Sequence, residues 1–244
     1  MDSNKVNYDF AKAWDISQGN FAGTMAQNII TFAANQNRKI SSVLDVCCGA
    51  SNLLGVFENQ GLKCYGTETR QGFLDYSKEK HPEITYYLTE KMYDIPGRAK
   101  VDLITCTHDI VNYFESFENW EDFFKDVEKH LNKKGMFVFD FYTKHKLSNW
   151  NETTYKSADS LDYLMSVKSG VYDKTVITYT YFINYDSYMI KTKDVVVESY
   201  FENQQIFDAL KKAGFKNVMI VDHELNQDSE FAYADRIHVV AMKK

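Results

Sequence analysis

The stretch Val43-Leu44-Asp45-Val46-Cys47-Cys48-Gly49-Ala50-Ser51 decides the fold of this chain. Its first six residues form a short, mostly apolar run that Gly49 interrupts, and this pattern is typical of a strand buried on both faces. Apolar residues at helical spacing follow as far as Phe57. We expect Ser51 and Asn52 to cap that helix. A buried strand, a tight turn and a helix in this order predict the first unit of a parallel α/β sheet.

The same pattern continues along the chain. After the strand at residues 43–48, apolar runs predict strands at residues 62–67, 84–88, 101–106, 136–141, 218–221 and 236–242. Helical spacing predicts helices at residues 21–32, 73–81, 120–131 and 203–214, and a turn is expected at residues 133–135. Strands without internal alternation, separated by helices, favour a sheet covered on both faces. We therefore expect a doubly wound, mostly parallel, seven-stranded α/β sheet.

Residues 148–200 have a different pattern. Their side chains alternate between apolar and polar, as at Val176, Thr178, Tyr188 and Ile190, which predicts antiparallel strands with one solvated face. We expect one domain, residues 1–147 with 201–244, and a small antiparallel β insertion at residues 148–200. The insertion is rich in tyrosine: Tyr172, Tyr179, Tyr181, Tyr185 and Tyr188. It could be a substrate lid, a small sheet that buries aromatic residues, or a dimer interface, and we favour the lid.

Composition narrows the range of functions that the chain can have. Among 244 residues there are only 11 glycines and 2 prolines, so a disordered or linker-rich chain is disfavoured. The net charge of -6 argues against nucleic-acid partners, which need clustered Lys and Arg. No apolar run reaches the roughly 18 residues of a membrane span, and no signal-peptide core is visible. We expect a soluble, cytoplasmic protein that binds neither nucleic acid nor membrane.

The four cysteines do not indicate a metal or disulfide framework. Cys47 and Cys48 are adjacent, Cys64 and Cys106 are isolated, and the chain has no C-x-x-C pair. We expect all four to be reduced, small buried residues, and we predict no metal site.

A ligand site is expected where the parallel strands end. In open α/β sheets the crevice lies at the carboxyl ends of the strands. Gly49 lets the backbone approach a ligand there, and Glu68 follows the second strand about twenty residues later, where an acid can hold a ribose diol. Together these features predict a cofactor that carries a nucleoside.

At this point the chain resembles class I S-adenosylmethionine-dependent methyltransferases of the small-molecule branch. Residues 43–51 are similar to the family's first motif, V-L-D-x-G-x-G-x-G, and Tyr65-Gly66-Thr67-Glu68 is similar to its acidic second motif. Further matches are Phe10-Ala11-Lys12-Ala13-Trp14-Asp15, residues 102–106 with 109–113, residues 135–140, and residues 210–215 with 237–243. The resemblance covers essentially the whole chain, insertion included.

The resemblance implies a Rossmann-like methyltransferase fold, with S-adenosylmethionine as cofactor and S-adenosylhomocysteine as product. It also implies methyl transfer to N or O of a small-molecule acceptor by a monomer or homodimer. The cofactor-binding residues it implies are Tyr8, Trp14, Asp45, Cys47, Cys48, Gly49, Ser51, Glu68, Thr69, Lys91, Met92 and Thr107.

The chain departs from the family pattern at three of these positions. Cys47 and Ser51 replace glycines of the first motif. Lys91 aligns with an Asp that usually accepts a hydrogen bond from the adenine amino group, and lysine cannot accept. Adenine recognition would then rest on the backbone of Met92 or on Glu90.

Three residues are candidates for catalysis. His108 follows the fourth strand and has a pKa range suited to removing a proton from an amine or hydroxyl, although a structural role is the alternative. Asp109 could orient the cofactor or an incoming ammonium. Tyr113, like Tyr8 and Trp14, could offer an aromatic face to the sulfonium cation, and ordinary packing is the alternative for each.

Two other functions compete with methyl transfer. A catalytically silent methyltransferase-fold protein that binds a ligand or partner is the first, and Cys47, Ser51 and Lys91 are the features that favour it. The second is a nicotinamide-dependent oxidoreductase, since Glu68 would serve either cofactor. Its G-x-G-x-x-G turn would fall on Cys47, Gly49 and Asn52, so two of three glycines are missing.

Overall fold

A computed structural model describes residues 3–97, 100–158, 161–171, 174–185, 188–226 and 234–244. It confirms the α/β class. Seven strands form one sheet in the order β10-β11-β5-β4-β1-β2-β3, in which β11 runs antiparallel to its neighbours and the other adjacent pairs are parallel. The strands are β1 Ser42–Asp45, β2 Lys63–Glu68, β3 Thr85–Leu88, β4 Val101–Cys106, β5 Leu131–Tyr142, β10 Asn217–Val221 and β11 Arg236–Met242.

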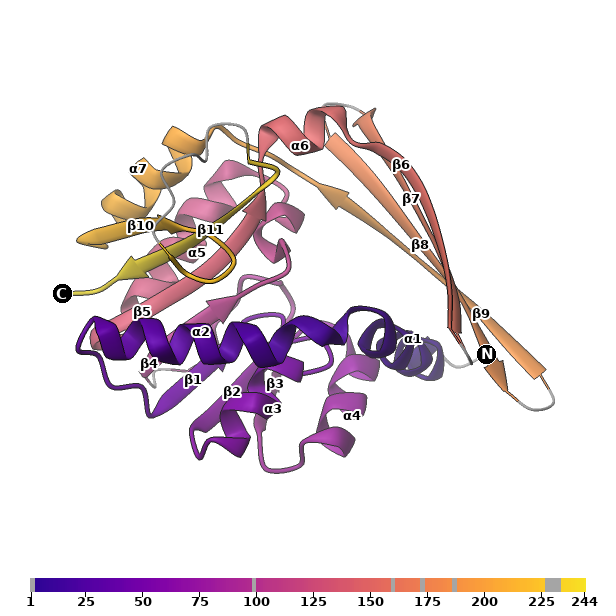
Figure 1. Cartoon of the computed structure of the whole chain (residues 1–244), viewed down its shortest axis with the longest axis horizontal. Helices are drawn as coiled ribbons and strands as arrows, with labels where there is room; N and C mark the ends of the chain where they lie inside the picture. The colour runs from indigo at the N-terminus through magenta and orange to yellow at the C-terminus, as the bar shows by residue number, and fades with distance from the viewer. Residues whose placement is uncertain (1–2, 98–99, 159–160, 172–173, 186–187, 227–233) are drawn as a thin grey trace.

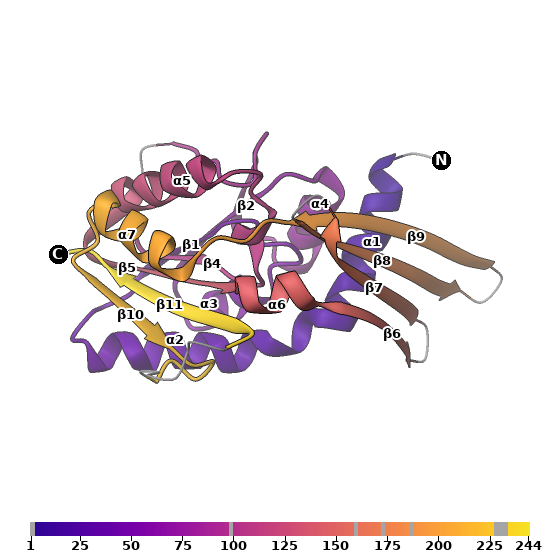
Figure 2. The same ribbon diagram turned by 90° about the horizontal axis from the view of Figure 1, so that it is seen from above.

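Helices cover both faces of the sheet (Figure 2). One face carries α2 Ala22–Asn35 and α3 Asn52–Asn59, and the other carries α5 Phe117–His130 and α7 Asn203–Ala213. Neighbouring residues of β1 therefore enter different cores, because successive side chains of a strand point to opposite faces. Val43 packs with α2 and α3, while Leu44 packs with α5 and α7.

Three local predictions differ from the structure. β1 ends at Asp45 rather than at residue 48, because the chain turns through a left-handed Cys47 (φ 55°). The expected turn at residues 133–135 is an irregularity within β5, where Lys134 has φ 62°. Ser51 precedes α3, but the prediction that its side chain caps the helix is wrong. Its backbone is left-handed (φ 58°), and its hydroxyl lies 3.4 Å from Cys48 Sγ instead of reaching an amide of the first turn.

The insertion is the predicted antiparallel sheet, with four strands in sequence order (Figure 1). After α6 Lys144–Asn149 come β6 Asn151–Ala158, β7 Leu161–Val171, β8 Lys174–Tyr185 and β9 Tyr188–Glu198. The sheet extends away from the α/β core. Tyr179 and Tyr181 are buried on its inner face, whereas Val195 and Val197 are about half exposed on the outer face. Tyr172 lies outside the described residues, as do the side chains of Tyr185 and Tyr188.

A helix at the start of the chain completes the architecture. The sequence did not predict α1 Ser3–Gln18, which packs between α4 Gln71–Lys80 and the inner face of the insertion. The buried Phe10 ring of α1 lies 5.7 Å from the Phe73 ring of α4 and 5.2 Å from the Tyr181 ring of β8. This third hydrophobic cluster joins the insertion to the α/β domain. Two short 3-10 helices, η1 Gly19–Phe21 and η2 Ile110–Tyr113, follow α1 and β4.

The cysteines are free thiols, as predicted. Cys48, Cys64 and Cys106 are buried and Cys47 is partly buried. Across the described ranges, no helix combines the length and apolarity needed to cross a membrane. The same residues contain no group of three or more His, Cys, Asp and Glu side chains arranged to hold a metal ion.

Candidate active site

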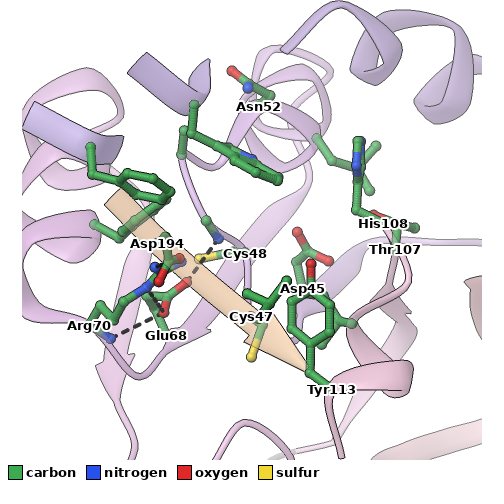
Figure 3. Close-up of a pocket in the computed structure, with 18 of the residues that line it drawn as sticks. Asp45, Cys47, Cys48, Asn52, Glu68, Arg70, Thr107, His108, Tyr113 and Asp194 are labelled. Atoms are coloured by element: carbon green, nitrogen blue, oxygen red, sulfur yellow. Dashed lines mark hydrogen bonds and ion pairs between the residues drawn. The ribbon is translucent and has the colours of Figure 1, made fainter. Parts of the chain in front are cut away.

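A pocket opens at the carboxyl ends of β1, β2 and β4, beneath α1 and the insertion (Figure 3). Its walls come from the loop after β1, the residues after β2 and β4, and the inner faces of α1, β8 and β9. Nine of the predicted site residues line it: Trp14, Asp45, Cys47, Cys48, Gly49, Glu68, Thr107, His108 and Tyr113. The structure therefore brings together most of the positions that the sequence selected.

In the loop after β1 every second residue has a left-handed backbone, which explains why the residues there are small. Cys47, Gly49 and Ser51 all have left-handed φ values, of 55°, 54° and 58°. Glycine adopts this conformation without penalty, whereas another residue pays about 1–2 kcal/mol. Hydrogen bonds hold the strained position 47: its amide donates to Thr67 Oγ1 (3.2 Å) and its thiol donates to the Met92 carbonyl (3.3 Å). Positions 47 and 51, which are glycine in the family motif, thus keep the left-handed conformation although they carry cysteine and serine.

Glu68 ends β2 and ties that strand to the loop after β1. The residue is buried, with a relative exposure of 4%. Oε2 accepts from the Gly49 amide (3.3 Å), and Oε1 accepts from the amides of Thr69 (2.8 Å) and Arg70 (3.1 Å). A carboxylate oxygen can accept about two hydrogen bonds. Oε2 therefore keeps acceptor capacity for a hydroxyl group in the pocket that Glu68 lines.

Asp45 adds a second carboxyl group to the pocket wall. It ends β1, and its Oδ1 accepts a hydrogen bond from the Thr105 hydroxyl (2.6 Å). Burial raises the pKa of Asp45 to about 7, and the negative charge of Glu68 adds to the rise. A cation bound in the pocket would favour the ionised form of Asp45. This side of the pocket is thus suited to a positively charged ligand.

An ion pair connects the pocket to the insertion. Arg70, just after β2, donates to Asp194 of β9 (2.8 Å), and its guanidinium lies 4.1 Å from the centre of the Phe73 ring. Figure 3 shows Arg70, Asp194 and Glu68 together on one side of the pocket, with His108 and Thr107 on the other. Sequence reasoning missed both partners. The alternation of β9, which places Asp194 on the same face as Val196, was the signal that could have found one of them.

His108 and Asp109 lie in a strained turn after β4. Both have left-handed backbones, with φ values of 64° and 54°. Buried Asp140 holds the turn, because its carboxylate accepts from the amides of His108 (2.7 Å) and Asp109 (3.2 Å). Arg236 donates hydrogen bonds to both Asp109 and Asp140. Strain of this kind persists where the surroundings over-determine the backbone, and it clusters at functional sites.

The surroundings of the His108 ring determine its charge. It lines the pocket and packs edge-on against Phe21, with ring centres 4.1 Å apart. Burial lowers the pKa of His108, although the carboxylates of Asp109 and Asp140 oppose this effect. The imidazole is therefore neutral at neutral pH, which is the form that a general base requires.

Six predicted residues lie elsewhere: Tyr8, Ser51, Thr69, Lys91, Met92 and Asp109 are absent from the described lining of this pocket. The Tyr8 hydroxyl donates to Glu79 of α4, and its ring packs against Tyr76. Thr69 and Met92 line an adjoining pocket that shares Arg70, Tyr113 and Asp194 with the first. Lys91 is exposed in a further hollow, with Nζ 5.5 Å from the Tyr93 ring.

Comparison with known proteins shows that the chain is similar to methyltransferases. A family model described as a methyltransferase domain matches residues 18–220. A Bacillus subtilis (strain 168) protein, YqeM, carries a methyltransferase description and is 21% identical over 140 residues. That alignment covers 55% of this chain and 57% of YqeM, so the chain matches little more than half the length of this curated relative.

Solved structures share the fold over nearly the full chain. A S-adenosylmethionine-dependent methyltransferase from Clostridium acetobutylicum ATCC 824 superposes with a TM-score of 0.83 at 21% identity, covering 96% of this chain and 98% of that one. DesVI from Streptomyces venezuelae gives 0.80 at 18% identity, covering 97% and 99%. An amino pentose methyltransferase from Micromonospora echinaspora gives 0.75 at 15% identity, covering 97% of each chain.

Proposed function

The chain belongs to the methyltransferase-domain family, and from that premise we propose that it transfers a methyl group from S-adenosylmethionine to a nitrogen or oxygen of a small-molecule acceptor. One observation carries the proposal. The left-handed loop at Gly49 and the carboxylate of Glu68 meet in one pocket, joined by a hydrogen bond from the Gly49 amide to Oε2. A ribose diol and the chain attached to it need this combination of close backbone and acid.

The charges and aromatic rings of the pocket residues suit the cofactor. Glu68 Oε2 would accept from a ribose hydroxyl, and Asp45, with a pKa of about 7, would ionise beside a cation. Trp14 and Tyr113 present aromatic rings to the same pocket. Aromatic faces attract cations by about 0.5–2 kcal/mol. Thr69 and Met92 would contact the adenine end through the adjoining pocket that they line.

When bound, S-adenosylmethionine supplies an electrophilic methyl group on a sulfonium, and S-adenosylhomocysteine is the product. The residues of this chain have two tasks. They hold the acceptor atom close to the methyl carbon, since placing reacting atoms about 3–3.5 Å apart supplies much of the catalysis. They also remove the proton that the acceptor atom loses, and we assign this step to the neutral imidazole of His108.

The insertion supports a small-molecule acceptor. Its residues Tyr179, Asp194 and Val196 line the pocket opposite the α/β sheet, so an acceptor between them would be enclosed by the insertion. Among the structural neighbours, one is an amino pentose methyltransferase and another is a sugar N-methyltransferase. These neighbours favour an acceptor of similar size. We propose that residues 148–200 act as the substrate lid.

The second candidate function is that of a silent binding protein with the same fold. The observation that favours it is the Cys47 side chain, whose thiol reaches the Met92 carbonyl and occupies space beside the pocket that glycine would leave open. A silent protein would bind a ligand without turning it over, so binding measurements alone do not separate the two functions.

A transfer assay separates them. Purified protein is incubated with methyl-labelled S-adenosylmethionine and a panel of amines, amino sugars and their hydroxyl counterparts, and S-adenosylhomocysteine is measured. We expect its formation to depend on at least one acceptor and to fall in His108→Gln. Cofactor binding without acceptor-dependent product across the panel would favour the silent protein.

A further inference from the structure

Two consecutive residues with left-handed backbones, His108 and Asp109, form the turn after β4. Neither is glycine, so the turn is strained. A single carboxyl group binds both of its amides, because Asp140 Oδ1 accepts from the His108 amide (2.7 Å) and Oδ2 accepts from the Asp109 amide (3.2 Å). Asp140 lies near the end of β5, the neighbour of β4, and is 2% exposed. The direction in which the His108 side chain leaves the backbone therefore depends on Asp140.

The charges around Asp140 do not cancel. Arg236 of β11 donates to both Asp140 and Asp109, so two carboxylates share one guanidinium. Glu198 lies beside Asp109 and adds no charge. Burial and the Asp109 carboxyl raise the pKa of Glu198 well above its ordinary value, so it is protonated at neutral pH. Asp109, Asp140 and Arg236 thus leave one net negative charge close to the His108 imidazole.

This negative charge has a consequence for His108 because the imidazole is buried. Burial lowers the pKa of His108, and the carboxyl groups of Asp109 and Asp140 oppose the decrease. An imidazole that accepts a proton becomes a cation, and a cation is costly in a buried site unless an opposite charge lies nearby. When His108 takes up a proton, the imidazolium and the charged groups around it together become neutral.

Other titratable groups near His108 are neutral or lie farther from it. Burial raises the pKa of Tyr113 and of Tyr179, so both keep their protons. His238 pairs with Asp140 in the sheet, and burial lowers its pKa, so it is neutral at neutral pH. The charges that act most on His108 are those of Asp109, Asp140 and Arg236. Further titratable groups that line the pocket or the hollow beside it are Asp45, Glu68, Arg70, Asp194 and His223.

We propose that Asp140 is the positioning residue for proton transfer: it fixes the turn that presents His108 to the pocket, and it supplies negative charge that stabilises the imidazolium. The inference rests on the proposed function, because Asp140 acts through the base assigned there. The acceptor atom loses its proton to His108 and gains the methyl group from the sulfonium, and His108 then releases the proton to solvent. His108 also lines a hollow of about 450 Å³ that the exposed His223 borders, and this hollow offers a route for the proton to water.

Asp140→Asn tests the inference, since asparagine keeps the shape of the side chain and one oxygen for the His108 amide but loses the charge. Arg236 keeps Asp109 as its partner, so the buried charges of the variant stay balanced. The titration of the His108 ring is followed by NMR in protein saturated with S-adenosylhomocysteine, which requires no acceptor. We expect its midpoint to lie at lower pH in Asp140→Asn than in the wild type, because the imidazolium loses a neighbouring negative charge.

Turnover should respond as well. With an acceptor from the transfer assay, Asp140→Asn should lower kcat by at least about tenfold, which is part of the roughly 10²–10⁴-fold that a general base contributes. The affinity for S-adenosylhomocysteine should stay unchanged, because Asp140 does not line the pocket that holds Glu68.

Asp102→Asn is the matched control. Asp102 lies at the start of β4, at the opposite end of the strand from His108, and it too accepts hydrogen bonds from two consecutive amides, those of Ser41 (2.9 Å) and Ser42 (3.1 Å). This variant should leave the His108 midpoint and kcat as in the wild type. An unchanged midpoint in Asp140→Asn, or an equal change in Asp102→Asn, would overturn the inference.

A measurement on the wild type decides the case in which Asp140→Asn does not fold. The His108 amide, bound to a buried carboxylate, should exchange at least about a hundredfold more slowly than in an unstructured peptide. Rapid exchange would contradict the role of Asp140. The proposed function fails separately, if S-adenosylhomocysteine does not bind or if His108→Gln turns over like the wild type, and the inference then fails with it. The contrary outcomes for Asp140 leave cofactor binding in place.

Discussion

At the scale of single residues, the site contains several positions with a strained backbone, and hydrogen bonds to side chains hold the turns in which they lie. Cys47, Ser51, His108 and Asp109 all adopt left-handed conformations without being glycine. Each of the two turns is fastened to a polar group, Thr67 for the first and Asp140 for the second. Sequence comparison could mark Cys47 and Ser51 as departures from a glycine pattern. It could not show that the glycine backbone is retained.

Glu68 provides the most direct prediction at this scale. Replacing it with alanine removes an acceptor in the pocket and the bridge to the Gly49 amide. We expect Glu68→Ala to weaken S-adenosylhomocysteine binding by roughly 1.5–3 kcal/mol, the scale of a hydrogen bond to a charged group. Calorimetry measures the loss, with Glu83→Ala as a matched acid outside the pocket. Unchanged affinity would remove Glu68 from the cofactor site.

His108 predicts the pH dependence of turnover. Because burial lowers its pKa below the ordinary value of 6.5, the imidazole stays neutral until the pH falls below that value. The acid limb of kcat, measured with saturating cofactor and acceptor, should therefore lie below pH 6.5. His108→Gln should lower kcat and abolish that limb. A profile that keeps the same shape in the variant would exclude histidine as the base.

At the scale of elements, the strands of the large sheet and most helices along the chain were predictable, whereas α1 and α6 were not. Every strand of the large sheet and the alternation of the insertion were visible as apolar periodicity, because each element buries one face or both. The N-terminal helix α1 has alternating polar and apolar residues but packs against α4 and the insertion, which lie far away in the sequence. Arg70 with Asp194, and Glu198 with Asp109, depend on the same long-range packing.

Substitution of Phe10 tests whether the packing of α1 supports the insertion. Its ring is 3% exposed and packs against Phe73 and Tyr181. Phe10→Ala should lower the free energy of unfolding by about 3–5 kcal/mol, the usual cost of removing a buried ring. Amide exchange in β8 should also rise, because β8 would lose its support. Denaturant unfolding and hydrogen exchange measure the two effects.

Ile16→Ala is the matched control for Phe10, since Ile16 lies on the same helix and is 47% exposed. It should change the free energy of unfolding by no more than about 0.5 kcal/mol. Equal effects of the two substitutions would mean that α1 does not hold the insertion through Phe10.

At the scale of the molecule, residues from the mostly parallel sheet and from the antiparallel insertion line the same pocket. The large, mostly parallel sheet and the turns after its strands supply Asp45, Glu68 and His108 at its carboxyl edge, and the insertion supplies Tyr179 and Asp194. Figure 3 shows Asp45, Glu68, His108 and Asp194 around the pocket. The cofactor side of this pocket was predictable because strand ends converge by topology. The side formed by the insertion was not, because a period of two reveals which residues face inward but not what they face.

Titration of the wild-type protein with S-adenosylmethionine and, separately, with S-adenosylhomocysteine tests the central claim most directly. The account predicts saturable binding of both at one site in the micromolar range, about 8 kcal/mol, despite Cys47, Ser51 and Lys91. Absence of binding heat and of any thermal shift with either compound would contradict it, because the pocket at Gly49 and Glu68 would then not hold the cofactor.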